Sequence, residues 1–192
     1  PEFLILDDLR RIKRQGCNFI RGSHYPQREF LLDCCDELGL LVWEESTGWQ
    51  NTVAQFDDPE FHRQMREQTA AMVRKSFNHP SVILWGFLNE CHSNQPAARP
   101  MLAELVELIH RLDPSRPVTF ATMWGEQECC LDLFDVASFN IYPGWYSSLE
   151  LPDALDTVVP RVREILDFAA RPEYRDKPMI ISEIGAAAIL GE

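Results

Sequence analysis

Several features are missing from this 192-residue sequence, and each absence excludes a class of protein. No apolar run approaches the roughly 20 residues that a membrane-spanning helix requires. Lysine and arginine together number 18, against 30 aspartate and glutamate residues, so the formal net charge is -12 and no basic cluster offsets it locally. That balance argues against a nucleic-acid partner and against a polyanionic substrate. We therefore expect neither a membrane protein nor a nucleic-acid-binding protein.

The sequence also lacks the short motifs that bind nucleotides and zinc. No Gly-x-Gly-x-x-Gly and no phosphate-binding loop follows the first predicted strand. The six cysteines include no Cys-x-x-Cys pair, and two sets of them are adjacent neighbours, a spacing that rarely suits zinc or disulfide geometry. We interpret them as small buried hydrophobic residues in a reducing compartment, with a metal or disulfide role as the alternative. We predict no cofactor and no bound metal.

No signal peptide is visible at the start of the sequence. Residues 1–15 carry Asp7, Asp8, Arg10 and Arg11 where a signal peptide needs an apolar core. We therefore predict a cytoplasmic location.

What the sequence does contain is a regular alternation of amphipathic and apolar segments. Hydrophobic residues make up 45% of the chain and aromatic residues 10%, which is typical of a globular domain with a sizeable core. Apolar residues at helical spacing predict helices over residues 4–15, 27–38, 59–77, 100–112 and 152–170. Short apolar runs predict strands over residues 17–21, 40–44, 81–90, 118–121, 136–140 and 178–183.

This alternation predicts one α/β domain over residues 1–192, with a parallel sheet and helical crossovers. Polar residues end nearly every predicted strand. They favour a barrel, because the carboxyl ends of all strands converge on one face of a barrel.

Two of the buried strands end on glutamate, at Glu90 and Glu183. In a barrel these carboxyl groups face one cleft, and two carboxyl groups across a cleft are the minimum apparatus for cleaving a glycosidic bond. In the retaining mechanism one of them protonates the leaving oxygen and the other attacks the sugar carbon. The alternative for either glutamate alone is a helix cap or a surface residue.

Four stretches of the sequence, in order along the chain, carry a resemblance to a known family. They are Asn18-Phe19-Ile20-Arg21-Gly22-Ser23-His24-Tyr25-Pro26, Asn78-His79-Pro80-Ser81-Val82 with Trp85-Gly86 and Asn89-Glu90, Asn140-Ile141-Tyr142-Pro143-Gly144-Trp145-Tyr146, and Ile181-Ser182-Glu183-Ile184-Gly185. The chain resembles the catalytic (β/α)8 TIM barrel of the family 2 glycoside hydrolases, the group that contains β-glucuronidases, β-galactosidases and β-mannosidases.

The resemblance implies a role for each matching residue. Glu90 is then the general acid/base and Glu183 the nucleophile. Asn89 matches the residue that contacts the sugar 2-hydroxyl, Arg21 the arginine beside the nucleophile, and Tyr142 the tyrosine that hydrogen-bonds it. As alternatives, Arg21 forms a barrel ion pair and Tyr142 is a core residue with a satisfied hydroxyl.

His24 and three tryptophans complete the predicted substrate site. His24 matches a histidine that lines the sugar-binding subsite, with a turn residue as the alternative. Trp145, Trp49 and Trp124 follow strands and are candidates for stacking on sugar faces, or else core or rim aromatics. The metal-dependent β-galactosidases of the family carry Glu-x-His after the third strand. Residues 45–49 lack that histidine, which counts against a structural magnesium ion.

The resemblance also implies that this barrel is incomplete. About six of eight strands are expected here, because the first and the eighth fall outside the chain. We expect low or no activity from the isolated fragment, and self-association through its open barrel edges. The motifs predict hydrolysis of terminal β-D-glycosidic bonds, most like a β-glucuronidase. β-Galactosidase, β-mannosidase and a non-catalytic barrel remain alternatives.

Overall fold

The structure, a computed structural model, describes residues 1–145 and 154–185. Its strands are β1 (Phe19–Gly22), β2 (Leu41–Glu45), β3 (Val82–Gly86), β4 (Val118–Thr119), β5 (Ala121–Thr122), β6 (Ala137–Asn140) and β7 (Met179–Glu183). Its α-helices are α1 (Glu2–Arg14), α2 (Glu29–Leu38), α3 (Val53–Phe56), α4 (Pro59–Ser76), α5 (Arg99–Leu112) and α6 (Val158–Ala169). Short 3-10 turns cover Pro96–Ala98, Gly125–Gln127, Leu131–Leu133 and Ala154–Thr157. No helix among the described residues is long and apolar enough to cross a membrane.

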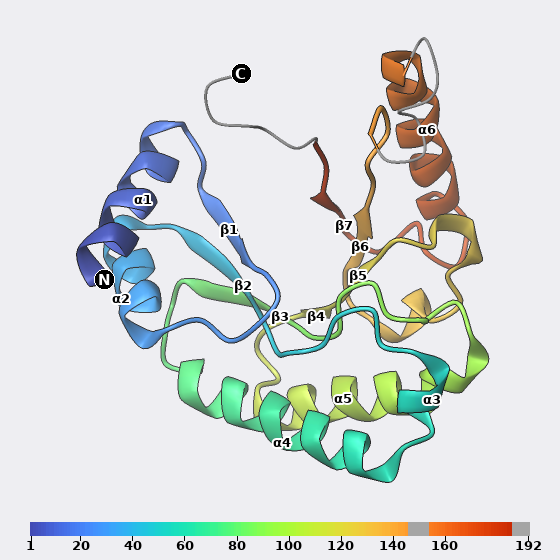
Figure 1. Cartoon of the computed structure of the whole chain (residues 1–192), viewed down its shortest axis with the longest axis horizontal. Coiled ribbons are helices and arrows are strands. Elements are labelled where there is room, and N and C mark those ends of the chain that lie inside the picture. The colour runs from blue at the N-terminus through green and yellow to red at the C-terminus, as the bar shows by residue number, and fades with distance from the viewer. Residues whose placement is uncertain (146–153, 186–192) are drawn as a thin grey trace.

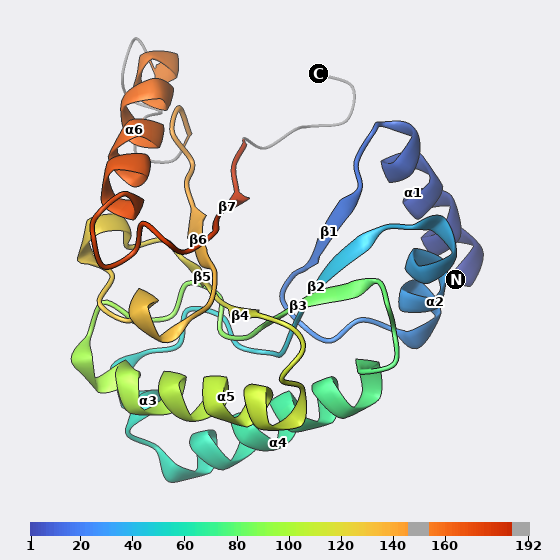
Figure 2. The same cartoon turned by 180° about the vertical axis from the view of Figure 1, so that it is seen from behind.

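The strands form a curved wall in which every pairing is parallel. The order is β1-β2-β3-β4 in one sheet and β5-β6-β7 in the next. Only Phe120 separates β4 from β5, so the seven short strands occupy the six positions that the sequence predicts. Figure 1 shows α4 and α5 against one side of the wall, with α1 and α2 near β1 and α6 beyond β6; Figure 2 shows the same arrangement from behind.

The two ends of the wall are open. Within the described residues, β1 pairs only with β2 and β7 only with β6. The structure is therefore a partial TIM barrel, as the sequence predicts.

The local signals that start and stop the helices act as expected. Asp58 caps α4 by accepting a hydrogen bond from the Glu60 amide, and Pro59 occupies the first helical position. Gly39 ends α2 in the left-handed conformation, with φ of 65°, which costs glycine little.

Apolar side chains pack on both faces of the wall. The barrel interior holds a small cluster of Trp43, Leu84, Ala121 and Val136. The larger core lies between the wall and the helices and includes Trp85, Phe87, Phe120, Phe139 and Ile109. Because alternate residues of a strand point to opposite faces, neighbours such as Leu84 and Trp85 belong to different cores.

Two predicted boundaries differ from the structure. The strand expected over residues 81–90 ends at Gly86, because Leu88 and Glu90 adopt positive φ values of 54° and 51° that no regular strand contains. The helix expected over residues 152–170 begins at Val158 after a 3-10 turn, and residues 152 and 153 of the prediction lie outside the described part of the chain.

Candidate active site

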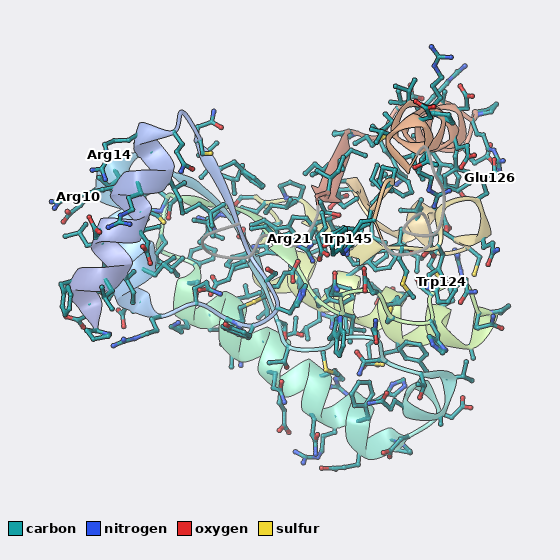
Figure 3. All side chains as sticks on the ribbon, turned by 45° about the horizontal axis from the view of Figure 1, so that its top comes forward. Arg10, Arg14, Arg21, Trp124, Glu126 and Trp145 are labelled. Carbon is teal, nitrogen blue, oxygen red and sulfur yellow. The ribbon has the colours of Figure 1, made fainter. Side chains whose placement is uncertain are left out.

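Arg21, from β1, is the centre of a network at the carboxyl ends of the strands. Its Nε lies 2.5 Å from Glu45 Oε1, its Nη1 2.7 Å from Glu183 Oε1, and its Nη2 2.8 Å from Asn89 Oδ1. The guanidinium also lies over the Trp43 ring, 4.5 Å from its centroid, and the side chain is 9% exposed. Figure 3 shows Arg21 reaching into the middle of the molecule. One buried cation thus connects β1, β2, β7 and the segment that follows β3.

Glu183, the last residue of β7, receives a donor on each carboxyl oxygen. Arg21 donates to Oε1, and the Tyr142 hydroxyl donates to Oε2 at 2.6 Å. Phe139 pairs with Ile181, but the next residue of β6, Asn140, pairs with Glu183, so the register skips Ser182. This β-bulge turns Glu183 toward the network. A cationic and a phenolic donor therefore fix the orientation of the Glu183 carboxyl group.

Glu90 receives neutral donors. Asn140 Nδ2 lies 3.0 Å from Glu90 Oε1 and also 3.0 Å from Asn89 Oδ1, while Gln50 Nε2 lies 3.4 Å from Glu90 Oε2. Consecutive residues of a regular strand would point to opposite faces. The positive φ of Glu90 breaks that alternation, so Asn89 and Glu90 both reach Asn140.

Both glutamates line one cavity of about 830 Å³. It lies between the strand ends and the start of α6, and Glu90, Asn140, Tyr142, Glu183, Thr157 and Arg161 are among its lining residues. The prediction that one cleft contains the two carboxyl groups is therefore confirmed.

His24 and Glu45 extend the network on the other side of Arg21. His24 Nδ1 lies 3.2 Å from Glu45 Oε2, and its Nε2 lies 3.9 Å from Glu183 Oε1. The His24 ring therefore lies between the carboxyl groups of Glu45 and Glu183. His24 is thus at the site where the sequence placed it.

Glu45 and Asn140 also belong to the network, although neither was among the predicted site residues. Both end buried strands and are almost completely buried themselves, with exposed fractions of 2% and 4%. A polar residue at the carboxyl end of a buried strand is the same signal that identified Glu90 and Glu183. It was sufficient to find them as well.

The predicted tryptophans have different environments. Trp124 donates its indole N–H to the Cys91 carbonyl at 2.7 Å and packs edge-on against His92, which is a structural role. Trp145 is half-buried and its backbone N–H donates to the Tyr142 carbonyl, but it is not among the described residues that line the cavity. Its substrate contact stays a prediction. Trp49 is 57% exposed.

The cysteines are all unpaired, but two of them contradict the prediction of burial. Cys17 and Cys129 are exposed, while the other four are buried. Burial raises the pKa of Cys35 and of Cys91 to about 12, so these thiols are protonated and inert.

Within the described part of the chain, two groups of side chains are spaced closely enough to hold a metal ion, namely Glu128 with Cys129 and Cys130, and Asp33 with Asp36 and His79. Glu128 already accepts from two hydroxyls and two backbone N–H groups, at 2.5 to 2.9 Å. His79 Nδ1 lies 2.7 Å from Asp36 and is occupied in the same way. Both groups therefore have internal partners that account for them.

Residues 1–192 match the model of the glycosyl hydrolases family 2 TIM barrel domain. The chain belongs to family 2 of the glycosyl hydrolases.

Several members of the family are similar over nearly all of this chain. A β-glucuronidase from Sus scrofa is 34% identical over 190 residues, which are 98% of this chain and 28% of the relative. A β-galacturonidase from Eisenbergiella tayi, solved with bound galacturonate, is 39% identical with a TM-score of 0.88, and the match covers 100% of this chain and 33% of that one. A Bifidobacterium dentium β-glucuronidase is 28% identical with a TM-score of 0.90, over 100% and 31% of the two chains. This family 2 chain therefore spans about a third of the length of these relatives.

Proposed function

We propose that the complete protein containing this chain hydrolyses terminal β-D-glycosidic bonds with retention of configuration, most like a β-glucuronidase. The observation that carries the proposal is the different environment of two carboxyl groups in one cavity. Glu183 is held by Arg21 and Tyr142, and Glu90 by neutral amides. That difference supports an ionised nucleophile and a proton-carrying acid.

The reaction proceeds in two displacements. Glu183 attacks the anomeric carbon while Glu90 gives its proton to the glycosidic oxygen, so the bond to the leaving group breaks and a glycosyl ester forms on Glu183. Glu90, now ionised, takes a proton from water. The water oxygen attacks the anomeric carbon, and the Glu183 carboxylate is released. Two inversions give net retention.

Three neighbours prepare the site for these steps. Arg21 and Tyr142 hold both Glu183 oxygens in place before attack. Asn89 accepts from Arg21 and from Asn140 through its Oδ1, which leaves its Nδ2 donors for the sugar 2-hydroxyl. Such a contact contributes to rate when it strengthens in the transition state.

Substrates with a uronic acid are the best candidates. The β-glucuronidase from Sus scrofa and four further relatives, all β-glucuronidases, are 31 to 34% identical to this chain. The 39% identity to a β-galacturonidase specifically favours β-D-galacturonides as a second candidate. β-Galactosides and β-mannosides remain the alternatives from sequence.

The proposal is tested with the complete protein and four 4-nitrophenyl glycosides, the β-D-glucuronide, β-D-galacturonide, β-D-galactoside and β-D-mannoside. We expect the protein to turn over one of the two uronides faster than the other three substrates. Proton NMR is expected to show the β-anomer of the released sugar as the first product. An α-anomer as first product would exclude retention. No turnover of any of the four would leave the non-catalytic barrel as the better hypothesis.

The same assay on residues 1–192 alone tests the expectation of low activity and of self-association. The open edges at β1 and β7 support association, because unpaired strand edges pair readily with other chains. Size-exclusion chromatography of the isolated chain is expected to show oligomers, and a monomer would contradict this.

The six unpaired cysteines support a cytoplasmic location, which cell fractionation tests.

A further inference from the structure

The segment after β2 runs alongside the segment that carries Glu90. The Asn89 amide donates to the Gly48 carbonyl at 2.8 Å, and the Gln50 amide donates to the Asn89 carbonyl at 2.8 Å. Between these two bonds, Trp49 and Asn89 form a parallel bridge. The pairing of β2 with β3 thus resumes after a short interruption, and it places Trp49 directly beside Asn89.

This pairing determines the face to which Trp49 belongs. Residues paired across neighbouring strands carry their side chains on the same face of a sheet. The Asn89 side chain points to the catalytic network, where it contacts Arg21 and Asn140. The pairing therefore places Trp49 on the catalytic face, outside the set of described residues that line the cavity. It is 57% exposed, whereas the other tryptophans of the chain are buried or half-buried.

The Trp49 segment is held firmly on both sides. A Cβ on Gly48, whose φ is 128°, would lie 2.3 Å from Leu88 Cδ2, so only glycine allows the two segments to approach this closely. Gln50 has a φ of 49°, and its side-chain amide contacts Glu90 Oε2. Directly after it, Thr52 and Gln55 form a capping box that starts α3. An aromatic ring on such a segment is preorganised, so little conformational entropy is lost when a ligand stacks on it.

We propose that Trp49 is the platform of the leaving-group subsite, and that this subsite takes a leaving group with a six-membered ring, either a planar aryl ring or the C–H face of a pyranose. The inference rests on the proposed function, because an acid that protonates the glycosidic oxygen has the leaving group beside it. Trp49 pairs with Asn89, the residue directly before Glu90. Gln50 holds the Glu90 carboxyl group against the same segment. We therefore expect the protein to prefer β-glycosides whose leaving group contains a ring over β-glycosides with a short alkyl leaving group.

The experiment compares Trp49→Ala and Trp49→Phe in the complete protein, with two glycosides of whichever sugar the panel above selects. One carries a 4-methylumbelliferyl leaving group, and the other carries a trifluoroethyl group that has no ring. We expect Trp49→Ala to lower kcat/KM for the bicyclic substrate about 5- to 100-fold, chiefly through KM, which is the range for loss of ring stacking on an aromatic side chain. The trifluoroethyl substrate is expected to change less than about twofold, and Trp49→Phe to retain most of the activity.

Phe3→Ala is the matched control, because Phe3 is also an exposed aromatic residue, 69% exposed on α1, and does not belong to the network or line the cavity. It is expected to leave both substrates unchanged. An equal loss on both substrates in Trp49→Ala, or no loss on either, would overturn the subsite while leaving the hydrolase intact. Absence of turnover in the unsubstituted protein would overturn the proposed function, and the subsite with it.

Discussion

Glu90 and Glu183 come from the same kind of sequence, an apolar run that ends in a carboxylate, but their surroundings differ. Glu90 lies in the middle of the wall. Its amide donates to the Ala121 carbonyl on one side, and Gln50 contacts its side chain from the other. Glu183 ends β7, which has a neighbour only on the β6 side within the described residues. Position within the sheet thus gives Glu90 neutral amide partners and Glu183 a cation, and the proposed roles of acid and nucleophile rest on this difference.

The largest effect is expected when the nucleophile is removed. Glu183→Gln keeps the size and one acceptor oxygen for Arg21 and Tyr142 but cannot form the glycosyl ester. We expect kcat in the complete protein to fall by about 10⁴-fold or more for every substrate. Unchanged thermal unfolding is the control for folding. A residual rate within tenfold of the unsubstituted protein would assign the nucleophile to another residue.

Removing the acid tests the other half of the comparison. Glu90→Gln is expected to lower kcat/KM about 10²- to 10⁴-fold for alkyl leaving groups, and less for 4-nitrophenol, which leaves without protonation. Azide needs no base to attack the glycosyl ester, so it should restore turnover and yield a β-glycosyl azide. The same azide is expected to have no effect on Glu183→Gln. Equal losses for good and poor leaving groups would contradict the acid role.

Glu45 is expected to act through Arg21 and His24, as a positioning residue. Glu45→Gln removes the charge that faces the Arg21 Nε and His24 Nδ1. A hydrogen bond to a charged group is worth about 1.5 to 3 kcal/mol, so kcat should fall about 10- to 100-fold while KM changes little. Glu45→Asp should recover part of that loss. A change confined to thermal stability would show that Glu45 only supports the fold.

Substitution of Glu44, the residue before Glu45, is expected to have the smallest effect, and it is the matched control for Glu45→Gln. It lies on the opposite face, where its Oε1 accepts from the Gln27 amide, and burial raises the pKa of its carboxyl group above the ordinary value. As pH rises past about 4.3, the unfolded chain releases this proton before the folded chain does, so folding stability declines until the folded pKa is passed.

Glu44→Gln should therefore leave activity unchanged and raise the free energy of unfolding at pH 7 by up to about 1.4 kcal/mol for each unit of pKa shift. At pH 4 the two proteins should be nearly equal. Urea unfolding at the two pH values measures this. Greater destabilisation of Glu44→Gln at pH 7 than at pH 4 would reverse the sign and contradict the prediction.

The sequence was sufficient to predict the fold class, the six strand positions and the two glutamates, because each depends on local patterns. Alternating apolar runs and helical periodicity identify the elements, and polar strand ends identify the face that carries the site. The predicted strand to Glu90 was too long, since the positive φ values at Leu88 and Glu90 leave no trace in residue type. The bulge that turns Glu183 inward depends on its register with Asn140, which is a property of two segments far apart in sequence. The partnership of Arg21 with Glu45 was missed for the same reason.

The interruption at Phe120 divides the wall into two blocks, and the chemistry straddles their boundary. Arg21, Glu45 and Asn89 belong to the first block, whereas Asn140 and Glu183 belong to the second. The hydrogen bonds from Arg21 to Glu183 and from Asn140 to Glu90 therefore connect the two blocks, and they also orient the two carboxyl groups. A displacement of one block against the other would alter the distance between acid and nucleophile directly. The geometry of the proposed catalytic residues therefore depends on how the two blocks of the barrel are assembled.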